Sequence, residues 1–582
     1  MQTAMVFLCV LIFLIAAAYI AGSANRKRED DALLKKLADS FGKRPDKKIP
    51  GERSRHLDGY YKAHPEPVPG GIDDITWNDL ELSLVLQRTD TTRSSAGEEY
   101  LYYALRTAKR LSAREREVLD YLTGSASSSE RSKLQFLLSK LGDTGHYSLY
   151  DYLEKLKDAP RRGPLRDLPA ILFPFAGVAF MFVNVPAGVL CLLLSFLFGT
   201  VTYFRDKAEI LPYITCLQYI LRLSSCGERL SAAGKTSECL QLQAMAAEIG
   251  QAAAPLASLR RGSFLLMSPA GAAGPADFVL DYLRILFHLD LIKFSSLMRG
   301  ILGHEGDIDR LITLTGRLDM LISTASFRKS LPYWCHPDFS GEDEAGSVFL
   351  DVRELYHPLL SKAVPNDLQT DRNILLTGSN ASGKSTFLKA AAICALWGQA
   401  LDTCPAASYR APEYTIMTSM ALRDSIQNGQ SYFIAEIQSL KRIQDAAKES
   451  DGRPVLCCID EVLRGTNTIE RIAASTKILE SFSGLPVLCF AATHDIELTS
   501  LLQGYNNYHF EEELERGDVV FSYKLRRGPA DTRNAIRLLR AAGFPNAVTD
   551  GAAEMAGHFE KTGHWLNMQP EMKNNAECHN LQ

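Results

Sequence analysis

The sequence predicts two regions of different fold class, a mostly α-helical region first and an α/β domain from about residue 346. Three observations lead to this prediction. Before residue 346, leucine-rich segments such as residues 278–286 have the spacing of helices. After it, short β-rich runs alternate with helices, which is typical of an α/β domain. Two uncharged segments, residues 5–22 and 168–204, predict transmembrane helices as a third component.

The composition fits a globular protein with large cores: 46% of the 582 residues are apolar and 23% are charged. The net charge of −4 gives no bulk evidence for nucleic-acid binding, so any such surface must be local. The twelve cysteines show no C-x-x-C pair and no metal-ligand spacing. Cys457, Cys458 and Cys489 lie in apolar runs and are typical of small buried side chains in a reducing compartment.

A phosphate-binding loop is predicted where an apolar run at residues 374–376 leads into GSNASGKS. This is G-x-x-x-x-G-K-[ST] between a strand and a helix. Glycines allow the required backbone geometry, and Lys384 would reach the β- and γ-phosphates while Ser385 holds Mg²⁺. The alternative, an ordinary glycine and serine turn, is disfavoured by the partner motifs downstream. The predicted ATP-binding residues of this loop are Gly378, Ser379, Asn380, Ala381, Ser382, Gly383, Lys384, Ser385 and Thr386.

Two further apolar strands end in residues suited to phosphate chemistry. Residues 455–459 lead into Asp460 and Glu461, and residues 487–493 lead into His494. At the carboxyl ends of parallel strands, Asp460 would position Mg²⁺ through water and Glu461 would act as general base on the attacking water. His494 would sense the γ-phosphate, although a histidine at a strand end is more commonly structural. The predicted catalytic residues are thus Lys384, Glu461 and His494, and the cofactors are ATP and Mg²⁺.

The segments TGSNASGKST, IDEVLRGTNT and AATHDIELT resemble the ATPase domain of the MutS family, a branch of the ABC-type ATPases. Residues 429–437, GQSYFIAEI, are similar to that family's signature G-x-S-x-F-x-x-E. The resemblance implies a homodimer with composite sites, in which Ser431 reaches the γ-phosphate bound to the opposite subunit. It also implies that Val364 lies against adenine, and that residues 523–528 and 542–545 contribute to dimerisation.

Upstream, residues 72–82 and 97–106 resemble the start of the family's helical core, and residues 318–321 resemble its end. The resemblance does not extend to the module that reads mismatched bases through an F-x-E motif. The F-x-E at residues 510–512 lies inside the ATPase region. We therefore expect DNA binding by family analogy, without mismatch specificity.

Both uncharged segments predict membrane insertion. Residues 5–22 are followed by Arg26, Lys27 and Arg28, which places the N-terminus outside the cell; a cleaved signal peptide is the alternative. Residues 168–204 are divided near Pro186 and have basic residues at both ends, which predicts a transmembrane hairpin; a buried helical pair is the alternative. Three crossings predict a multi-pass cell-membrane protein whose ATPase domain is cytoplasmic.

We therefore expect a membrane-anchored, MutS-like, Mg²⁺-dependent ATPase that dimerises through its ATPase domain around nucleotide. The alternative is a membrane-tethered mechanochemical ATPase that acts on a protein or on the membrane itself. A substrate-exporting transporter is disfavoured because three short spans make too small a membrane domain. The predicted segments are an anchor (1–22), a basic juxtamembrane segment and linker (23–70), the first part of the helical core (71–167), the hairpin (168–204), the second part of the core (205–345), the ATPase domain (346–563) and a polar tail (564–582).

Overall fold

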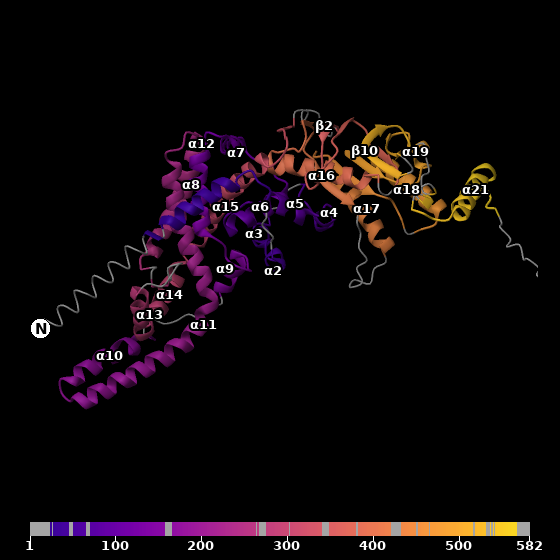
Figure 1. Cartoon of the computed structure of the whole chain (residues 1–582). Coiled ribbons are helices and arrows are strands. Elements are labelled where there is room, and N and C mark those ends of the chain that lie inside the picture. The colour runs from indigo at the N-terminus through magenta and orange to yellow at the C-terminus, as the bar shows by residue number, and fades with distance from the viewer. Residues whose placement is uncertain are drawn as a thin grey trace, which may run out of the picture.

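The structure is a computed structural model that describes residues 24–566, except residues 26, 46–49, 66–69, 158–165, 263–264, 267–274, 302, 340–347, 380–381, 421–431, 450–451, 465, 516–517, 531–535, 537–538 and 541. The molecule is elongated, with a protruding helical pair at one end, a helical region in the middle and a sheet domain at the other end (Figure 1). The predicted order of a helical region followed by an α/β domain is confirmed.

The first part of the helical region consists of short helices. They are α2 (Gly51–Ser54), α3 (Gly59–Ala63), α4 (Asp74–Asp79), α5 (Leu82–Thr89), α6 (Ser95–Thr107), α7 (Ala113–Thr123), α8 (Ser128–Leu141) and α9 (Leu149–Lys157). The second part has longer ones: α10 (Leu168–Met181), α11 (Val185–Gly234), α12 (Leu240–Ala253), the 3₁₀ helix η1 (Ala254–Arg260), α13 (Pro275–Phe287), α14 (Leu289–Ile301) and α15 (Glu305–Lys329).

The contact between α6 and α15 organises the helical region. Asp319 on α15 is buried and accepts hydrogen bonds from Ser94 Oγ (2.6 Å) and from the backbone nitrogens of Ser94 (2.9 Å) and Arg93 (3.0 Å). It thereby satisfies donors at the start of α6. A Cβ on Gly97 would lie 2.3 Å from the Asp319 carboxylate, so glycine is needed for this approach. The two segments that resemble the start and the end of the family's core are thus in contact.

Residues 23–70 were predicted to be a basic juxtamembrane segment and linker, and the structure shows that described parts of this segment fold onto the helical region. The buried guanidinium of Arg53 donates to Glu98 (2.9 Å) and Glu99 (3.0 Å) on α6. The Tyr60 ring lies edge-on to Tyr100, with 5.4 Å between ring centroids. Sequence reasoning missed these contacts because they join residues about 40 positions apart, whereas the charge pattern reports only on local surroundings.

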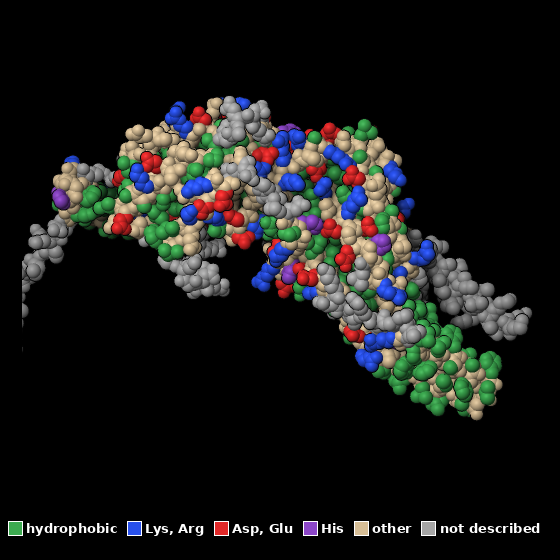
Figure 2. Space-filling view, turned by 180° about the vertical axis from the view of Figure 1, so that it is seen from behind, with side chains coloured by type: hydrophobic (Ala, Val, Ile, Leu, Met, Phe, Trp, Pro, Cys, Tyr) green, Lys and Arg blue, Asp and Glu red, His purple; other side chains and the backbone are tan. Residues whose placement is uncertain are grey.

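The predicted break near Pro186 is confirmed: α10 ends at Met181, and the Asn184 side chain caps the start of α11. The second arm does not end at residue 204 as predicted, because α11 continues without interruption for 50 residues and enters the helical region. The pair protrudes, and apolar side chains cover it (Figure 2). Its exposed apolar residues include Leu172, Phe175, Phe180, Phe182, Val183, Leu190, Leu193, Leu194, Phe196, Leu197 and Val201. The alternative of a buried pair is therefore wrong.

Among the described residues, one helical segment is long and apolar enough to cross a membrane, Val185–Leu211 within α11, with a mean hydropathy of 2.0. Helix α10 has 14 residues and is about 21 Å long, which is short of a hydrocarbon core of about 30 Å. The predicted anchor at residues 5–22 lies outside the described residues. The prediction of three spanning helices is therefore not supported. The uncharged stretch at residues 168–204 is divided into two arms of unequal length.

The α/β domain contains two sheets. The larger has the strand order β10-β9-β4-β8-β7-β6 and consists of β4 (Ile374–Thr377), β6 (Thr415–Ser419), β7 (Val455–Asp460), β8 (Val487–Ala492), β9 (Asn506–Glu515) and β10 (Asp518–Arg527). The smaller has the order β1-β5-β2-β3 and consists of β1 (Pro337–Asp338), β2 (Leu350–Leu355), β3 (Asn366–Thr370) and β5 (Ser408–Arg410). The helices are α16 (Lys384–Leu401), α17 (Tyr432–Glu449), α18 (Thr468–Phe482), α19 (Leu498–Leu501) and α21 (Asn546–Thr562).

The strands predicted at β4, β7 and β8 are present, and all three are parallel. Their apolar runs are continuous because helices cover both faces of the sheet. Alternate residues point to opposite sides: Leu456 and Cys458 lie in the core shared with α16, whereas Cys457 and Ile459 lie in the core shared with α17 and α18. The carboxyl ends of β4, β7 and β8 therefore meet at one edge of the sheet.

Candidate nucleotide-binding site

The loop between β4 and α16 has the geometry of an anion-binding turn. Gly378 and Gly383 have φ angles of 136° and 108°, which favour glycine. A Cβ on Gly378 would lie 3.0 Å from the carbonyl oxygen of Phe510. Gly383 caps α16, whose first N–H groups have no partner within the helix and attract negative charge. Asn380 and Ala381, also predicted to contact phosphate, lie outside the described residues.

Lys384 directs its ammonium into this loop. Its Nζ donates to the carbonyl oxygens of Gly378 (2.6 Å) and Ser379 (2.7 Å) and lies 3.4 Å from Nε2 of His494. The hydroxyl of Ser379 is buried and has no hydrogen-bond partner among the residues that the structure describes. A buried cation and an unsatisfied hydroxyl in the same loop fit a phosphate ligand, because its oxygens accept from both.

Ser385 and Asp460 meet although they are far apart in the chain. The Ser385 hydroxyl, in the first turn of α16, donates to Oδ2 of Asp460 at the end of β7, at 2.5 Å. A hydroxyl and a carboxylate are the hard oxygen ligands that Mg²⁺ prefers. These two side chains therefore fit the predicted Mg²⁺ site.

Glu461 and His494 are also brought together. Oε1 of Glu461 lies 3.0 Å from Nε2 of His494, and Oε2 lies 2.7 Å from Nε of Arg464. The hydrogen bond with His494 and the nearby charge of Arg464 lower the pKa of Glu461, although burial opposes the shift. The carboxylate is therefore ionised at neutral pH, as a proton acceptor must be. Its φ angle of 64° places it in a left-handed turn directly after β7.

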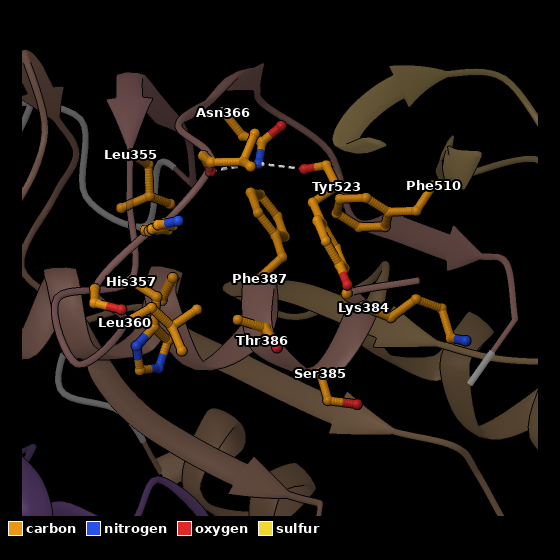
Figure 3. A pocket seen from close by; sticks show the side chains of 16 residues that line it. Leu355, His357, Leu360, Asn366, Lys384, Ser385, Thr386, Phe387, Phe510 and Tyr523 are labelled. Carbon is orange, nitrogen blue, oxygen red and sulfur yellow. Dashed lines mark hydrogen bonds between the residues drawn. The ribbon is translucent and has the colours of Figure 1, made fainter. Parts of the chain in front are cut away.

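A cavity of about 560 Å³ opens beside the loop, a volume that suits a nucleotide-sized ligand (Figure 3). Lys384 and Ser385 lie on one side of it, and His357 and Leu360 lie on the other, with Phe387 between them. Burial and the charge of Lys389 lower the pKa of His357 to about 4, so this imidazole is neutral at pH 7. The cavity thus pairs a phosphate-binding end with an end suited to a neutral base or sugar.

Val364, the predicted adenine contact, lines the same cavity. Tyr523 also lines this cavity. The sequence predicted a role for its segment in dimerisation but did not predict that Tyr523 is a site residue. A register shift between Phe521 and Leu525 bulges β10, and Tyr523 has a φ of 51°. Asn366 fixes the bulge: its Nδ2 donates to the Tyr523 carbonyl oxygen (3.0 Å), and its Oδ1 accepts from Leu525 N (2.7 Å). A sequence pattern does not reveal such a bulge.

Ser431, predicted to act across the dimer, lies outside the described residues. Glu436, from the same signature motif, is described and buried on α17. Its Oε1 accepts from the backbone nitrogen of Leu463 at 2.5 Å, and burial raises the pKa of its carboxyl group. Glu436 therefore holds the turn that carries Glu461, a role that sequence reasoning did not assign.

One other cluster of the described residues brings three potential metal ligands together: Asp120, His336 and Asp402. Arg328 donates to both carboxylates, at 2.6 Å and 3.0 Å. The guanidinium already supplies the positive charge between them, so we assign no metal to this cluster.

The phosphate-binding loop, the Ser385–Asp460 contact and the adjoining cavity define a P-loop nucleotide-binding domain. Residues 374–560 match the family model MutS domain V. The chain is 31% identical over 292 residues to the DNA mismatch repair protein MutS of Lactobacillus delbrueckii subsp. bulgaricus, which covers 47% of this chain and 33% of that protein. It is 34% identical over 248 residues to the MutS of Nitratidesulfovibrio vulgaris (39% and 26%), and 33% identical over 205 residues to that of Thermus aquaticus (34% and 25%).

Residues 374–560 therefore form a domain of the MutS domain V family, and this part of the chain is similar to MutS proteins. The matched part spans about a third or less of the length of these curated relatives.

We predict that Lys384→Ala lowers ATP affinity and turnover, because it removes the only side-chain cation that the structure places inside the described part of the loop. The loss of turnover should be about 100-fold or more, as for other groups that stabilise a transition-state charge. Binding of a fluorescent ATP analogue and the release of phosphate measure the two effects. The matched control is Lys389→Ala on the same helix, whose ammonium pairs with Glu81 (3.0 Å). Equal turnover in both variants would contradict the assignment of the loop.

We predict that Glu461→Gln keeps ATP binding and slows hydrolysis by about 100- to 10,000-fold, the usual contribution of a general base. The amide retains the size of the side chain but accepts no proton. Single-turnover hydrolysis separates this step from product release. Asp495→Asn is a control at the end of the neighbouring strand, because Asp495 pairs with Arg471 (2.6 Å) instead of facing the loop. If Glu461→Gln hydrolyses ATP at the parent rate, another group is the base.

Proposed function

We propose that this chain binds and hydrolyses ATP at the site between β4, β7 and β8. One observation carries the proposal: a single edge of the sheet gathers the buried Lys384 ammonium, the Ser385–Asp460 pair and the ionised Glu461. Together these groups provide a cation for the phosphates, oxygen ligands for Mg²⁺ and a proton acceptor for water.

Each group has a defined part in the reaction. Lys384 exchanges its two backbone carbonyl partners for phosphate oxygens, while the base and sugar occupy the cavity beside Tyr523 and Val364. Bound Mg²⁺ supplies charge neutralisation for the phosphate oxygens. Both oxygens of Glu461 have partners, His494 and Arg464, so one contact must lengthen before the carboxylate can accept the proton of the attacking water.

We further propose that the chain forms a homodimer in which Ser431 of one subunit completes the site of the other. The support is the match of residues 374–560 to MutS domain V, together with the signature motif at residues 429–437 of the sequence. In a two-fold dimer each subunit would give and receive one signature segment, so two identical composite sites result.

Mixing two inactive variants tests this arrangement. We predict that Lys384→Ala and Ser431→Ala are each inactive alone, and that a mixture regains ATPase activity. In the mixed dimer, one site combines an intact loop with an intact Ser431, whereas the other site carries both defects. With random pairing and independent sites, the mixture should regain about a quarter of the parent rate. If both variants are inactive alone, no recovery in a mixture whose mixed dimers are verified by native mass spectrometry would mean that Ser431 acts within its own subunit. Activity of Ser431→Ala alone would mean that Ser431 has no role in the site.

We propose DNA as the ligand of the helical region. The support is that the similar proteins are DNA mismatch repair proteins MutS, although the matched segments cover only part of them. The alternative is a protein or membrane client, and the exposed apolar pair α10–α11 favours it. We also propose that the protein resides at the cell membrane with its ATPase domain in the cytoplasm, on the support of the apolar segment Val185–Leu211.

The response of the ATPase to DNA distinguishes these clients. For the detergent-solubilised protein, we predict that DNA stimulates turnover and that the stimulation falls steeply between 50 and about 200 mM salt, because phosphate contacts release counterions. Homoduplex, mismatched and branched DNA are compared, and we expect no preference for the mismatch. With Lys384→Ala as the inactive control, a rate that no DNA changes would favour the protein or membrane client.

A further inference from the structure

The base of the α10–α11 hairpin is a layer of paired charges. Asp167 lies 3.0 Å from Nδ1 of His288, whose Nε2 lies 3.1 Å from the Gly199 carbonyl oxygen. Arg166 donates to Asp206 at 3.0 Å, so the start of α10 is tied to α11 at this level. Beyond it, residues 168–204 contain no charged side chain. The layer therefore marks where the hairpin changes from a charged surface to a charge-free, mostly apolar one.

The shorter arm limits how far the hairpin can extend into an apolar phase. Helix α10 starts at Leu168, directly after the charged Arg166 and Asp167, and its 14 residues measure about 21 Å. On α11, the distance from Gly199 to Val185 is also about 21 Å at 1.5 Å per residue. A hydrocarbon core is about 30 Å thick. The apolar part of the hairpin thus passes the midplane of a bilayer and ends before the far interface.

The tip is built for hydrocarbon rather than for water. Phe182 and Val183 are 89% and 85% exposed. The backbone nitrogens of the turn nevertheless have partners: Phe182 donates to Ala179 O (3.2 Å), and Val183 and Asn184 both donate to Phe180 O (3.0 and 2.8 Å). The Asn184 side chain accepts from Ala187 N at 3.1 Å, and Pro186 has no N–H. Inside a bilayer backbone donors must be satisfied within the protein, and Phe182, Val183 and Asn184 meet that requirement.

The two arms also contact each other in the way that membrane helices do. A Cβ on Gly188 would lie 2.6 Å from the backbone nitrogen of Met181, and one on Gly177 would lie 2.8 Å from Cδ2 of Leu192. Small residues at a crossing allow close van der Waals contact, which holds helices together where no hydrophobic effect acts between them. The pair therefore does not require a protein surface to cover it.

On the basis of the proposed membrane association, and independently of the ATPase activity, we propose that the hairpin is re-entrant. Its partner is the hydrocarbon interior of a lipid bilayer, which it enters and leaves on the same side. Asp167 and His288 stay at the near interface, Arg166 and Asp206 lie outside it, and the tip at Val183 remains inside the hydrocarbon. The tip residues Phe182, Val183, Asn184 and Val185 include no charged residue, tryptophan or tyrosine that would anchor them at a far interface.

Accessibility of a cysteine at the tip tests this topology. The full chain carrying Val183→Cys is reconstituted in phospholipid vesicles with the ATPase domain outside. A membrane-impermeant maleimide is added outside or trapped inside, and labelled peptides are counted by mass spectrometry. The matched control is Ser129→Cys, at an exposed position on α8. Maleimides react with the thiolate, which hydrocarbon disfavours, so we expect Val183→Cys to react about tenfold or more slowly than the control from either side and equally fast once the protein is denatured in guanidinium.

Each other result contradicts a defined part of the proposal. Labelling by the reagent trapped inside the vesicles would mean that the tip reaches the far side of the bilayer. This result would overturn the re-entrant topology but would still support insertion into the membrane. Labelling from outside at the rate of Ser129→Cys means that the hairpin is not in the membrane, which overturns both. The native Cys191 on α11 gives the same readout without any change at the tip, and should be protected in vesicles. A failure of ATP hydrolysis affects none of these readouts.

Discussion

The helical region and the ATPase domain depend on one buried cation at their junction, Arg328 at the end of α15. Its side chain is fully buried and donates to Asp120 (2.6 Å), to the carbonyl oxygen of Asp402 (2.6 Å) and to Thr403 Oγ1 (2.8 Å). Trp334 covers it at 4.1 Å. Removing one partner of such a pair costs about 3–5 kcal/mol, because a charge remains buried without compensation. Asp402 caps the C-terminal end of α16, the helix that begins with Lys384, so one helix connects the junction to the phosphate site.

A second contact joins the two regions at the edge strand β6. The buried carboxylate of Asp79 on α4 accepts from Thr418 Oγ1 (2.7 Å) and from Met420 N (2.9 Å). Nearby, Arg442 on α17 donates to Asp73 at 2.5 Å. Strand β6 and helix α17 flank the segment that contains the signature motif. The helical region therefore contacts the ATPase domain both at the C-terminal end of the phosphate-loop helix α16 and at strand β6 with helix α17. A rotation of one region relative to the other must change both together.

The sequence predicted those parts of the site that short, continuous motifs form. The phosphate loop and the acidic end of β7 follow apolar runs whose strand character is local, so the meeting of Ser385 with Asp460 follows from the parallel sheet. Tyr523 was missed as a residue of the cavity because a bulge in β10, fixed by Asn366 from another sheet, brings it there. Likewise, the length of the charge-free stretch at residues 168–204 can be taken from the sequence, but the points at which its helices begin and end cannot. The sequence therefore suggested two spanning arms, whereas α10 is too short and α11 continues far beyond residue 204.

The continuity of α11 bears on how the two ends of the molecule communicate. Its 50 residues form one rod of about 75 Å, with its first part exposed in the hairpin and its later part packed against α8, α12 and α15. Helix α15 in turn ends at Arg328, which contacts the cap of α16. A series of rigid helices thus connects the hairpin tip to the phosphate loop without a flexible linker among them. The same helices would connect the ATP site to a DNA client or to a membrane client. The two proposals therefore differ only in what the helical region binds, and not in how the ATP site is connected to it.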